Sequence, residues 1–528
     1  MARPRRFAGV GRTAAAFALI ALIVVPVLAA SGPIDPGRAT SSSPSGVAQA
    51  RSSSSPASPP TASPAAAHTP ASTTPAASPA APDRDTAGGD TPGGDTSGRD
   101  TAGRDTQGAR PEPTVRGVER LIAGSVNRTS IELTAEYDVA LALGFGSRSF
   151  RVDAIMTIRN DSAEPIDRVE LNTAAARLGA MKLGAVTVQG RSVKASVDDQ
   201  TIVVPLGGVL GVGQSVQVRV GYSATLRSNV TGSNWLFTRT NGIVNAYRWL
   251  PWVSRRVAFD RPNHGDPFVT PVSPRVRVAI TSDRALVFAT TGERVAASGL
   301  RQTFEARDVR DFTFTAAPDY RTVSSTVGDT TIRVYYRPGG PAQSILSAAK
   351  NAIAKMEPLV GQYPYPTYDL AQTAGGYGME APGMTWIPTG AGNLSYLVTH
   401  ETGHQWFYGV VGNDQASEPF TDEALTDMLA RYVLGQRRAS RCSTARLDLS
   451  IYRYSSACYY EIIYIQGGNF LDDIRKDMGT TAYWRAIRDY AAANRFKLAA
   501  TKTLLETLDD HTTLNLAKRY GSRFPSLY

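Results

Sequence analysis

The stretch HETGH at residues 400–404 is followed, after eighteen intervening residues, by Glu423. This pattern is the most informative feature of the sequence for the fold of its second half. Histidines at positions i and i+4 project from one face of a helix, so His400 and His404 can reach the same metal ion. A carboxylate from a following helix, Glu423, completes a set of two His and one Glu. Three protein ligands leave the fourth position of a tetrahedral zinc ion open, which is typical of a catalytic site. The pattern therefore predicts one catalytic Zn²⁺ per chain.

Glu401 lies between the two histidines, where a general base for a metal-bound water is needed. The alternative interpretation is that His400 and His404 are surface residues of an ordinary helix. The whole chain has only five His, so chance seldom produces this arrangement. Glu423 at a suitable spacing argues further against that alternative.

Three more stretches carry a family resemblance: GYGMEAPG at 376–383, FTDEA at 420–424 and YIQGG at 464–468. Together with HETGH they resemble the Gly-x-Met-Glu-Asn, Trp-Leu-Asn-Glu-Gly and Tyr-x-Lys-Gly-Ala segments of the M1 family of zinc aminopeptidases. These are gluzincins related to alanyl aminopeptidase and leukotriene A4 hydrolase. The resemblance spans residues 116–528, and its specific motifs lie in the second half of that range.

The resemblance implies roles for four further residues. Glu380, Gly378 and Met379 are expected to bind the substrate. Glu380 is expected to hold the free α-amine of a peptide, which restricts cleavage to the first residue. Tyr464 is expected to stabilise the negatively charged oxygen that forms beside the metal. Ala381 stands where the family has Asn, so any contact made by that Asn side chain is absent here.

The sequence leaves the roles of two carboxylates near Glu423 open. Asp427 follows Glu423 by four residues and could accept a hydrogen bond from a metal-bound His, but a solvated charge on a helix fits equally well. Asp422 replaces the family's usual Asn, and the sequence alone does not show what this replacement does.

The first 115 residues carry targeting and linker signals. Residues 1–30 have the basic start and apolar run of an export signal, and the apolar run of eighteen residues leaves a retained membrane anchor as the alternative. Residues 31–115 are rich in Ser, Pro, Ala and Thr and end in Asp-Thr pairs repeated every five residues, which predicts a disordered spacer. In an exported chain Cys442 and Cys458 can form a disulfide, with two free thiols as the alternative.

Two kinds of periodicity follow the spacer. Residues 116–325 alternate apolar and polar side chains, as at 150–155, 216–220, 276–280 and 312–314. This alternation predicts half-buried antiparallel strands in an all-β, sandwich-like domain. Residues 326–528 are expected, from the resemblance, to form a mainly α, thermolysin-like zinc peptidase domain. The predicted fold class is therefore multidomain α+β.

Helical spacing in the second domain predicts a helix at 344–356 and apolar helix faces at 470–478 and 484–490. The HETGH motif is expected on a helix at 394–410, and Glu423 on a helix at 421–434. Pro358 is expected to end the first helix at or before Glu357. The segment that contains Glu380 is expected to form an edge strand, because Tyr-Pro-Tyr-Pro at 363–366 precedes it. Trp406 and Phe407 are expected to pack the metal-binding helix into the core.

These features predict an exported, zinc-dependent aminopeptidase that acts on peptides with a free amino terminus. The alternatives are a zinc endopeptidase or another hydrolase on the same scaffold, and a non-catalytic envelope-binding module. Lys and Arg exceed Asp and Glu by ten (56 against 46), but residues 116–528 contain no basic block interleaved with aromatics, which argues against nucleic acid. Association with the cell envelope through the amino-terminal segment stays open, as does the oligomeric state. The excess of Arg over Lys indicates a bacterial source.

Overall fold

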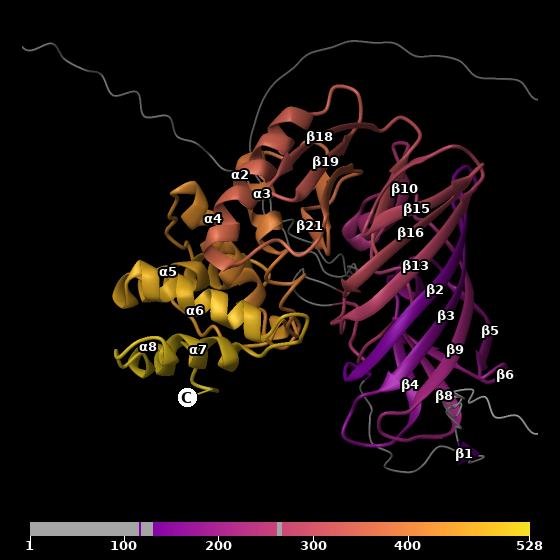
Figure 1. The fold of residues 1–528 in the computed structure, drawn as a ribbon, viewed down its shortest axis with the longest axis horizontal. Helices are drawn as coiled ribbons and strands as arrows, with labels where there is room; N and C mark the ends of the chain where they lie inside the picture. Colours follow the sequence, from indigo (N-terminus) through magenta and orange to yellow (C-terminus); the bar gives the residue numbers. More distant parts are fainter. Residues whose placement is uncertain (1–115, 118–129, 261–266, 528) are drawn as a thin grey trace, which may run out of the picture. The chain divides into compact units, whose positions relative to one another are not determined.

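The computed structural model describes residues 116–117, 130–260 and 267–527 (Figure 1). The export signal predicted for residues 1–30 and the spacer predicted for residues 31–115 lie outside the described residues. Within the described ranges, no helix combines the length and the apolar character needed to cross a membrane.

An eight-stranded sheet dominates the β-rich part of the chain, with strand order β15-β16-β13-β2-β3-β9-β5-β6 (Figure 1). Strand β2 pairs in parallel with β13 and antiparallel with β3. Every second residue of β2 is buried, as a sheet with one covered face requires. The strands predicted at 150–155, 216–220 and 276–280 lie within β3, β9 and β13, so their positions are confirmed. The expectation that all these strands are antiparallel is wrong for β13, which pairs in parallel with β2. The bounds are β2 (Leu133–Gly144), β3 (Ser149–Asn160), β5 (Lys182–Val188), β6 (Arg191–Ser192), β9 (Ser215–Thr225), β13 (Ser273–Ser282), β15 (Glu293–Ser298) and β16 (Arg301–Val309).

Two smaller sheets complete the β-rich part, in the orders β1-β8-β4-β12, with β7 paired to β8, and β10-β11-β17-β14. The strand predicted at 312–314 begins two residues later, at Phe314. Thr313 binds Thr291 instead of a ladder partner: its N–H donates to the Thr291 hydroxyl at 3.3 Å, and its carbonyl accepts from the Thr291 N–H. The bounds are β1 (Arg116–Gly117), β4 (Ile166–Asn172), α1 (Ala174–Leu178), β7 (Ser196–Asp198), β8 (Thr201–Leu210), η1 (Gly232–Leu236), β10 (Phe237–Thr240), β11 (Ile243–Ala246), β12 (Trp252–Val253), β14 (Val287–Thr290) and β17 (Phe314–Ala317).

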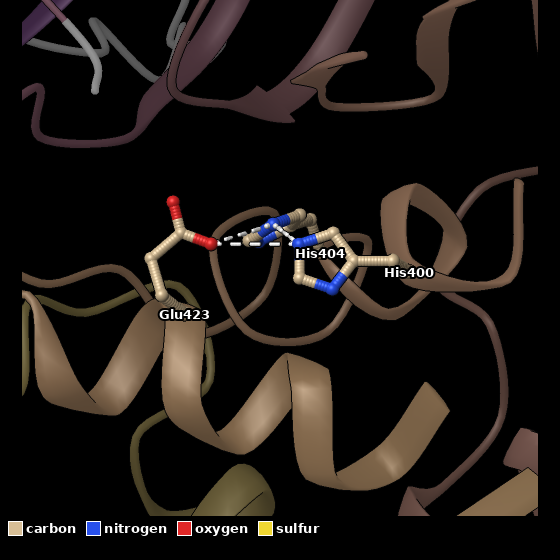
Figure 2. A group of neighbouring side chains, drawn as sticks. All are labelled: His400, His404 and Glu423. Atoms are coloured by element: carbon tan, nitrogen blue, oxygen red, sulfur yellow. Dashed lines mark hydrogen bonds and ion pairs between the residues drawn. The ribbon is translucent and has the colours of Figure 1, made fainter. Parts of the chain in front are cut away.

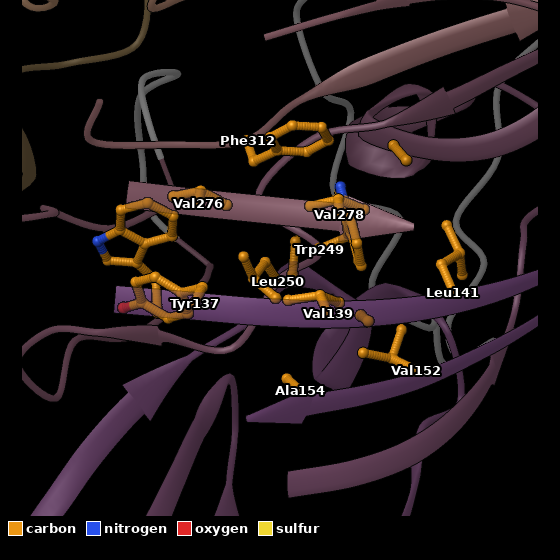
Figure 3. Packing of buried hydrophobic residues seen from close by; sticks show 14 of the residues in the cluster. Tyr137, Val139, Leu141, Val152, Ala154, Trp249, Leu250, Val276, Val278 and Phe312 are labelled. Atoms are coloured by element: carbon orange, nitrogen blue, oxygen red, sulfur yellow. The ribbon is translucent and has the colours of Figure 1, made fainter. Parts of the chain in front are cut away.

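The core of the β-rich part is built from the inward-facing residues of these strands and from a buried aromatic group (Figure 3). The rings of Tyr137 and Trp252 stack with centroids 4.4 Å apart. Trp249 packs edge-on against Phe312 and Phe314. Such aromatic pairs stabilise by about 0.5–1.5 kcal/mol beyond their buried area. This core holds the sheets together and extends to Met379 and Ala381, which flank Glu380 on β21.

A fourth sheet, of order β18-β19-β20-β22-β21, belongs to the second half of the chain. β21 carries Glu380 and pairs only with β22, so the predicted edge strand is confirmed. β18 spans the predicted domain boundary between residues 325 and 326, and the division into those two domains stays a prediction. This half therefore combines a five-stranded sheet with its helices. The bounds are β18 (Arg321–Val327), β19 (Thr330–Tyr336), β20 (Thr367–Thr373), β21 (Met379–Ala381) and β22 (Met384–Pro388).

Helix α2 (Ala342–Val360) shows that the expected stop at Pro358 is wrong, because the helix continues one turn further with Pro358 inside it. Met356 and Val360 are both buried, so the last turn adds to the apolar face that packs in the core. Arg488 donates to the carbonyl of Pro358 at 3.1 Å, which satisfies one of the acceptors left at the helix end. Burial of this last helical turn offsets the one backbone hydrogen bond that is lost because Pro358 has no N–H group.

Helix α3 (Leu394–Gly403) is shorter than the predicted 394–410 helix. After Gly403 the α-helical repeat is lost, because the Gln405 N–H donates to the Thr402 carbonyl and the Gly409 N–H to the His404 carbonyl. Two buried arginines from the β-rich part bind this segment: Arg310 donates to the Gly409 carbonyl at 3.5 Å, and Arg248 to the Tyr408 hydroxyl at 2.8 Å. These long-range contacts draw the chain away from the helix axis. Trp406 and Phe407 are buried, as expected.

The remaining helices follow in one compact group. The helix predicted at 421–434 is a π-helical turn, η2 (Phe420–Ala424), that continues into α4 (Leu425–Leu434). A second π-helical turn, η4 (Tyr460–Gln466), continues into α5 (Gly467–Met478). The helical faces predicted at 470–478 and 484–490 lie on α5 and α6, so those predictions are confirmed. The other bounds are η3 (Ile451–Arg453), α6 (Thr480–Ala493), α7 (Thr501–Asp510) and α8 (Ala517–Arg523).

Cys442 and Cys458 form a disulfide, with their Cα atoms 6.0 Å apart. The bridge closes the segment between α4 and η4, and Gln466 at the end of η4 binds the same segment by donating to the Cys442 and Ser443 carbonyls. The disulfide alternative is therefore confirmed over free thiols.

Candidate metal centre

Helix α3 and the residue after it supply two imidazoles to one point (Figure 2). Asn393 caps the start of α3, because its side-chain oxygen accepts from the Tyr396 N–H at 3.2 Å. His400 lies in the last turn of α3 and His404 directly follows it. Their Nε2 atoms are 3.2 Å apart. The i, i+4 spacing thus brings both rings together as the sequence predicted.

Glu423 completes the group from the π-helical turn η2 (Figure 2). Its Oε2 atom lies 3.5 Å from Nε2 of His400 and 3.4 Å from Nε2 of His404, beyond the range of a good hydrogen bond. A tetrahedral zinc ion with ligands at about 2.0–2.1 Å keeps its ligand atoms about 3.3–3.4 Å apart. The three atoms therefore have the spacing that one such ion requires, and the three residues fit zinc.

Neighbouring charge favours a cation at this point. Burial lowers the pKa of His400. Burial also lowers the pKa of His404, but the carboxylates of Asp422 and Glu380 outweigh it and raise that pKa well above its usual value. Burial raises the pKa of Glu423, yet its contacts with both histidines hold it well below its usual range. Negative charge is thus held around the two imidazoles, which are buried with the carboxylates.

Asp422 binds the far side of the same His404 ring. Its Oδ1 atom lies 2.8 Å from Nδ1 of His404, and Gln415 donates to its Oδ2 atom. Asp427, the residue that the sequence offered as a partner for a ligand His, instead accepts hydrogen bonds from Tyr396 and Arg431. Asp422 therefore contacts His404 directly, whereas Asp427 binds Tyr396 and Arg431 in the surroundings of the centre.

Glu401 and Glu380 form a second group with His404. Glu380, Glu401 and His404 each offer a ligand atom within 4.8 Å of the others, and all three residues are buried. Burial, opposed by His404 and reinforced by Glu423 and Asp422, raises the pKa of Glu401 to about 8. Two carboxylates therefore face one another next to the predicted ion. Met379 is buried beside Glu380 on β21.

Gly378 is required by the position of Glu401. A Cβ atom at residue 378 would lie 2.1 Å from Oε1 of Glu401 and 2.8 Å from Leu397, too close for any side chain. The glycine therefore lets the strand that carries Glu380 pass directly over the carboxylate. This contact gives a physical reason for glycine in the GYGME stretch.

Tyr464, in η4, lies with its ring over His400, centroids 5.5 Å apart and planes inclined by 22°. Burial, and then the charge of Glu423, raise the pKa of its hydroxyl well above the usual value, so it stays protonated and can donate. The close approach of η4 to η2 depends on Gly467, where a Cβ would lie 2.6 Å from that of Ala424. All eight residues that the sequence proposed for the site thus lie in one region.

Sequence reasoning missed two residues near the centre. Tyr396 lies with its ring 5.7 Å from that of His400, so the imidazole stacks with both Tyr396 and Tyr464. Tyr396 precedes His400 by four residues, and this helical spacing is the signal that would have revealed it. Gln415, which holds Asp422, lies in a loop and offers no such signal.

Comparison with known proteins gives a result at the level of the fold. No protein-family model matches the chain, and no curated protein sequence matches it. A mutant M1 zinc metallopeptidase from Deinococcus radiodurans has a similar structure, with a TM-score of 0.61 and 17% identity over 74% of this chain and 95% of that one. The M1 zinc metallopeptidase from the same organism gives a TM-score of 0.58 and 20% identity over 72% of this chain and 91% of that one.

Two further structures extend the comparison. A mutant of a two-domain M1 zinc metallopeptidase bound to L-arginine gives a TM-score of 0.59 and 18% identity over 72% of this chain and 91% of that one. A mutant of the Deinococcus radiodurans enzyme bound to a Tyr-Ser-Ala substrate gives a TM-score of 0.59 and 17% identity over 74% of this chain and 94% of that one. The chain therefore shares the fold of two-domain M1 zinc metallopeptidases.

Proposed function

We propose that this protein is a zinc-dependent aminopeptidase of the M1 family. The observation that carries the proposal is the triangle of two Nε2 atoms and one Oε2 atom, with sides of 3.2 to 3.5 Å. The fold shared with M1 zinc metallopeptidases supports it, and one of those structures holds a Tyr-Ser-Ala substrate. His400, His404 and Glu423 would hold the zinc, which when bound supplies a Lewis acid and an acidified water.

Glu401 is the general base of the proposed reaction. Its carboxylate has an oxygen within 4.8 Å of a ring nitrogen of His404, next to the proposed zinc position. It would take the proton of the attacking water and pass it to the leaving amine. Burial raises the pKa of this carboxyl group, and the positive charge of a bound zinc ion would lower that pKa and favour the ionised form that accepts the proton.

Tyr464 is the donor for the oxygen that becomes negatively charged during the attack. Its hydroxyl is kept protonated by burial and by the negative charge of Glu423. A preorganised donor of this kind stabilises charge that develops only in the transition state.

Glu380 gives the proposed enzyme its preference for the first residue of a peptide. Its carboxylate lies on the same side of the centre as Glu401, with a ligand atom within 4.8 Å of those of Glu401 and His404. An α-ammonium group bound there would place the carbonyl of the same residue next to the metal position. Pairing of the two charges in a buried site favours substrates with a free amine.

The test compares one fluorogenic aminoacyl amide with the same compound blocked at its amine. We expect one zinc per chain, cleavage of the free-amine compound alone, and loss of that preference in Glu380→Gln. Glu506→Gln, on the exposed face of α7, is the matched control and should behave as wild type. Equal cleavage of both compounds would favour an endopeptidase instead. Absence of both zinc and cleavage would favour a non-catalytic module.

Export of the chain is part of the proposal. A disulfide forms and persists in oxidising compartments, so the Cys442–Cys458 bridge supports a location outside the cytoplasm. Sequencing the amino terminus of the mature protein after expression in a bacterial host tests it. A start near residue 31 supports a cleaved signal, whereas a start at residue 1 supports a retained anchor or no export.

A further inference from the structure

The two histidines of the centre are held by different means. His404 is held by hydrogen bonds: Nδ1 lies 2.8 Å from Oδ1 of Asp422 and 3.2 Å from the Phe407 carbonyl. Nδ1 of His400, in contrast, has no hydrogen-bond partner among the described residues. Its ring stacks with those of Tyr396 and Tyr464 instead. One imidazole is therefore oriented by a carboxylate and the other by ring packing.

Asp422 and Glu423 are consecutive residues of η2, yet they contact opposite edges of the same imidazole. Oδ1 of Asp422 faces Nδ1 of His404, and Oε2 of Glu423 faces Nε2 at 3.4 Å. Both residues lie in a π-helical turn, a local departure from the α-helix that is found mostly at functional sites. Gln415 donates to the remaining oxygen of Asp422, and both side chains are buried. The position of the Asp422 carboxylate is thereby fixed from both of its oxygens.

We propose that Asp422 is a positioning residue for the metal centre, which orients His404 and strengthens its bond to the ion. A carboxylate at Nδ1 keeps the proton on that nitrogen, so the lone pair of Nε2 points towards Glu423 and His400. The full negative charge also increases the electron-donating power of the ring, which the amide of an Asn does not do. This inference rests on the proposed zinc function of the same site.

Asp422→Asn is the decisive variant, because it keeps the size of the side chain and removes only the charge. The purified full-length protein is stripped with a chelator, and the Zn²⁺ affinity is measured by competition with a chromophoric chelator. We expect zinc to bind about 10- to 100-fold more weakly than in wild type. The melting temperature of the zinc-free protein should stay unchanged, and the visible spectrum of the Co²⁺-loaded protein should shift.

Asp369→Asn is the matched control, because Asp369 is also a buried carboxylate of this half of the chain but binds Arg333. It should bind zinc as wild type does, even if the protein melts at a lower temperature. Gln415→Leu provides a second variant, which leaves Asp422 in place and should weaken zinc binding in the same direction, by less than Asp422→Asn.

The outcomes separate this inference from the proposed function. Wild type that binds no zinc would overturn the proposed function itself. Wild type that binds one zinc, with equal affinity in Asp422→Asn, would overturn only the role of Asp422. A loss of affinity matched by Asp369→Asn, or accompanied by an equal loss of stability in the zinc-free protein, would show a merely structural role and would also overturn it.

Discussion

The eight-stranded sheet and the pair of π-helical turns are built on opposite principles. In the sheet, β2 and β13 keep a regular ladder over seven paired residues, and burial alternates along each strand. In η2 and η4 the helical backbone departs from α geometry, and these two turns contain Glu423 and Tyr464. Regular backbone is sufficient where side chains only need burial, whereas irregular backbone occurs where side chains from separate segments must meet.

Small residues make the irregular region possible. Gly467 lets η4 approach η2, and Gly403 lets α3 approach α4, since Cβ atoms there would lie 2.6 Å from Ala424 and 2.9 Å from Thr426. Large residues make the sheet stable, because its interior is filled by side chains such as Trp249 and Tyr137 (Figure 3). We therefore expect substitutions near the two π-helical turns to lower turnover, and substitutions in the sheet to lower only the free energy of unfolding.

The largest effect is expected for Glu401→Gln. Loss of a positioned general base should lower turnover by about 100- to 10,000-fold. Gln keeps the shape of the side chain, so zinc content and melting temperature should match those of wild type. Steady-state rates and metal analysis on the same sample check this. Full activity with normal zinc content would mean that the reaction uses another base.

Tyr464→Phe tests the second turn. Removal of one hydroxyl should lower turnover by about 100- to 1000-fold, because a preorganised donor is lost. The ring stays over His400, so the folded state should be as stable as wild type. Tyr459→Phe is the control, since its ring also contacts that of Tyr464. An equal loss of activity in both variants would contradict a specific role for Tyr464.

Reduction of the Cys442–Cys458 bridge tests how the turn region is stabilised. Opening a loop of this length should cost about 3 kcal/mol of unfolding free energy. The free energy is measured by denaturant unfolding with and without reductant, and the Cys442→Ser/Cys458→Ser variant should match the reduced wild type. An unchanged midpoint would show that packing alone holds the segment between α4 and η4.

Gly467→Ala tests the close approach of the two turns. The added methyl group must displace Ala424 or η4, which should cost about 1–3 kcal/mol and lower turnover by moving Tyr464 away from Glu423. In Gly521→Ala, on α8, the added Cβ meets no described atom within 4 Å, so this control should keep or slightly raise stability. Normal turnover in Gly467→Ala would argue against the need for a close contact.

The smallest effect is expected in the sheet, for Ile280→Val. Ile280 is fully buried on β13, so loss of one methyl group should cost about 0.5–1.5 kcal/mol of unfolding free energy. Turnover per folded molecule should not change, because the residue belongs to the core of the β-rich part. Denaturant unfolding and rates measured together check both statements. A change in turnover would mean that the sheet and the centre are coupled, and the contrast between the two regions would fail.

Sequence periodicity reached most of the secondary structure but not its ends or its distortions. Alternation located β3, β9 and β13, and helical spacing located α2 and α3. The prediction that Pro358 ends α2 is wrong because Val360 packs in the core, and the prediction that α3 reaches Val410 is wrong because Arg248 and Arg310 bind the chain after His404. Both errors come from contacts between residues far apart in the sequence.

By itself the sequence determined that His400 and His404 face the same side, because two histidines four residues apart on a helix do so whatever surrounds them. Only the tertiary structure decided the rest: that Glu423 meets them from a π-helical turn, that Asp422 and not Asp427 contacts His404, and that Tyr396 packs against His400. Local spacing follows from the geometry of one helix, whereas these contacts depend on how close two segments can approach, which glycine and long-range packing set.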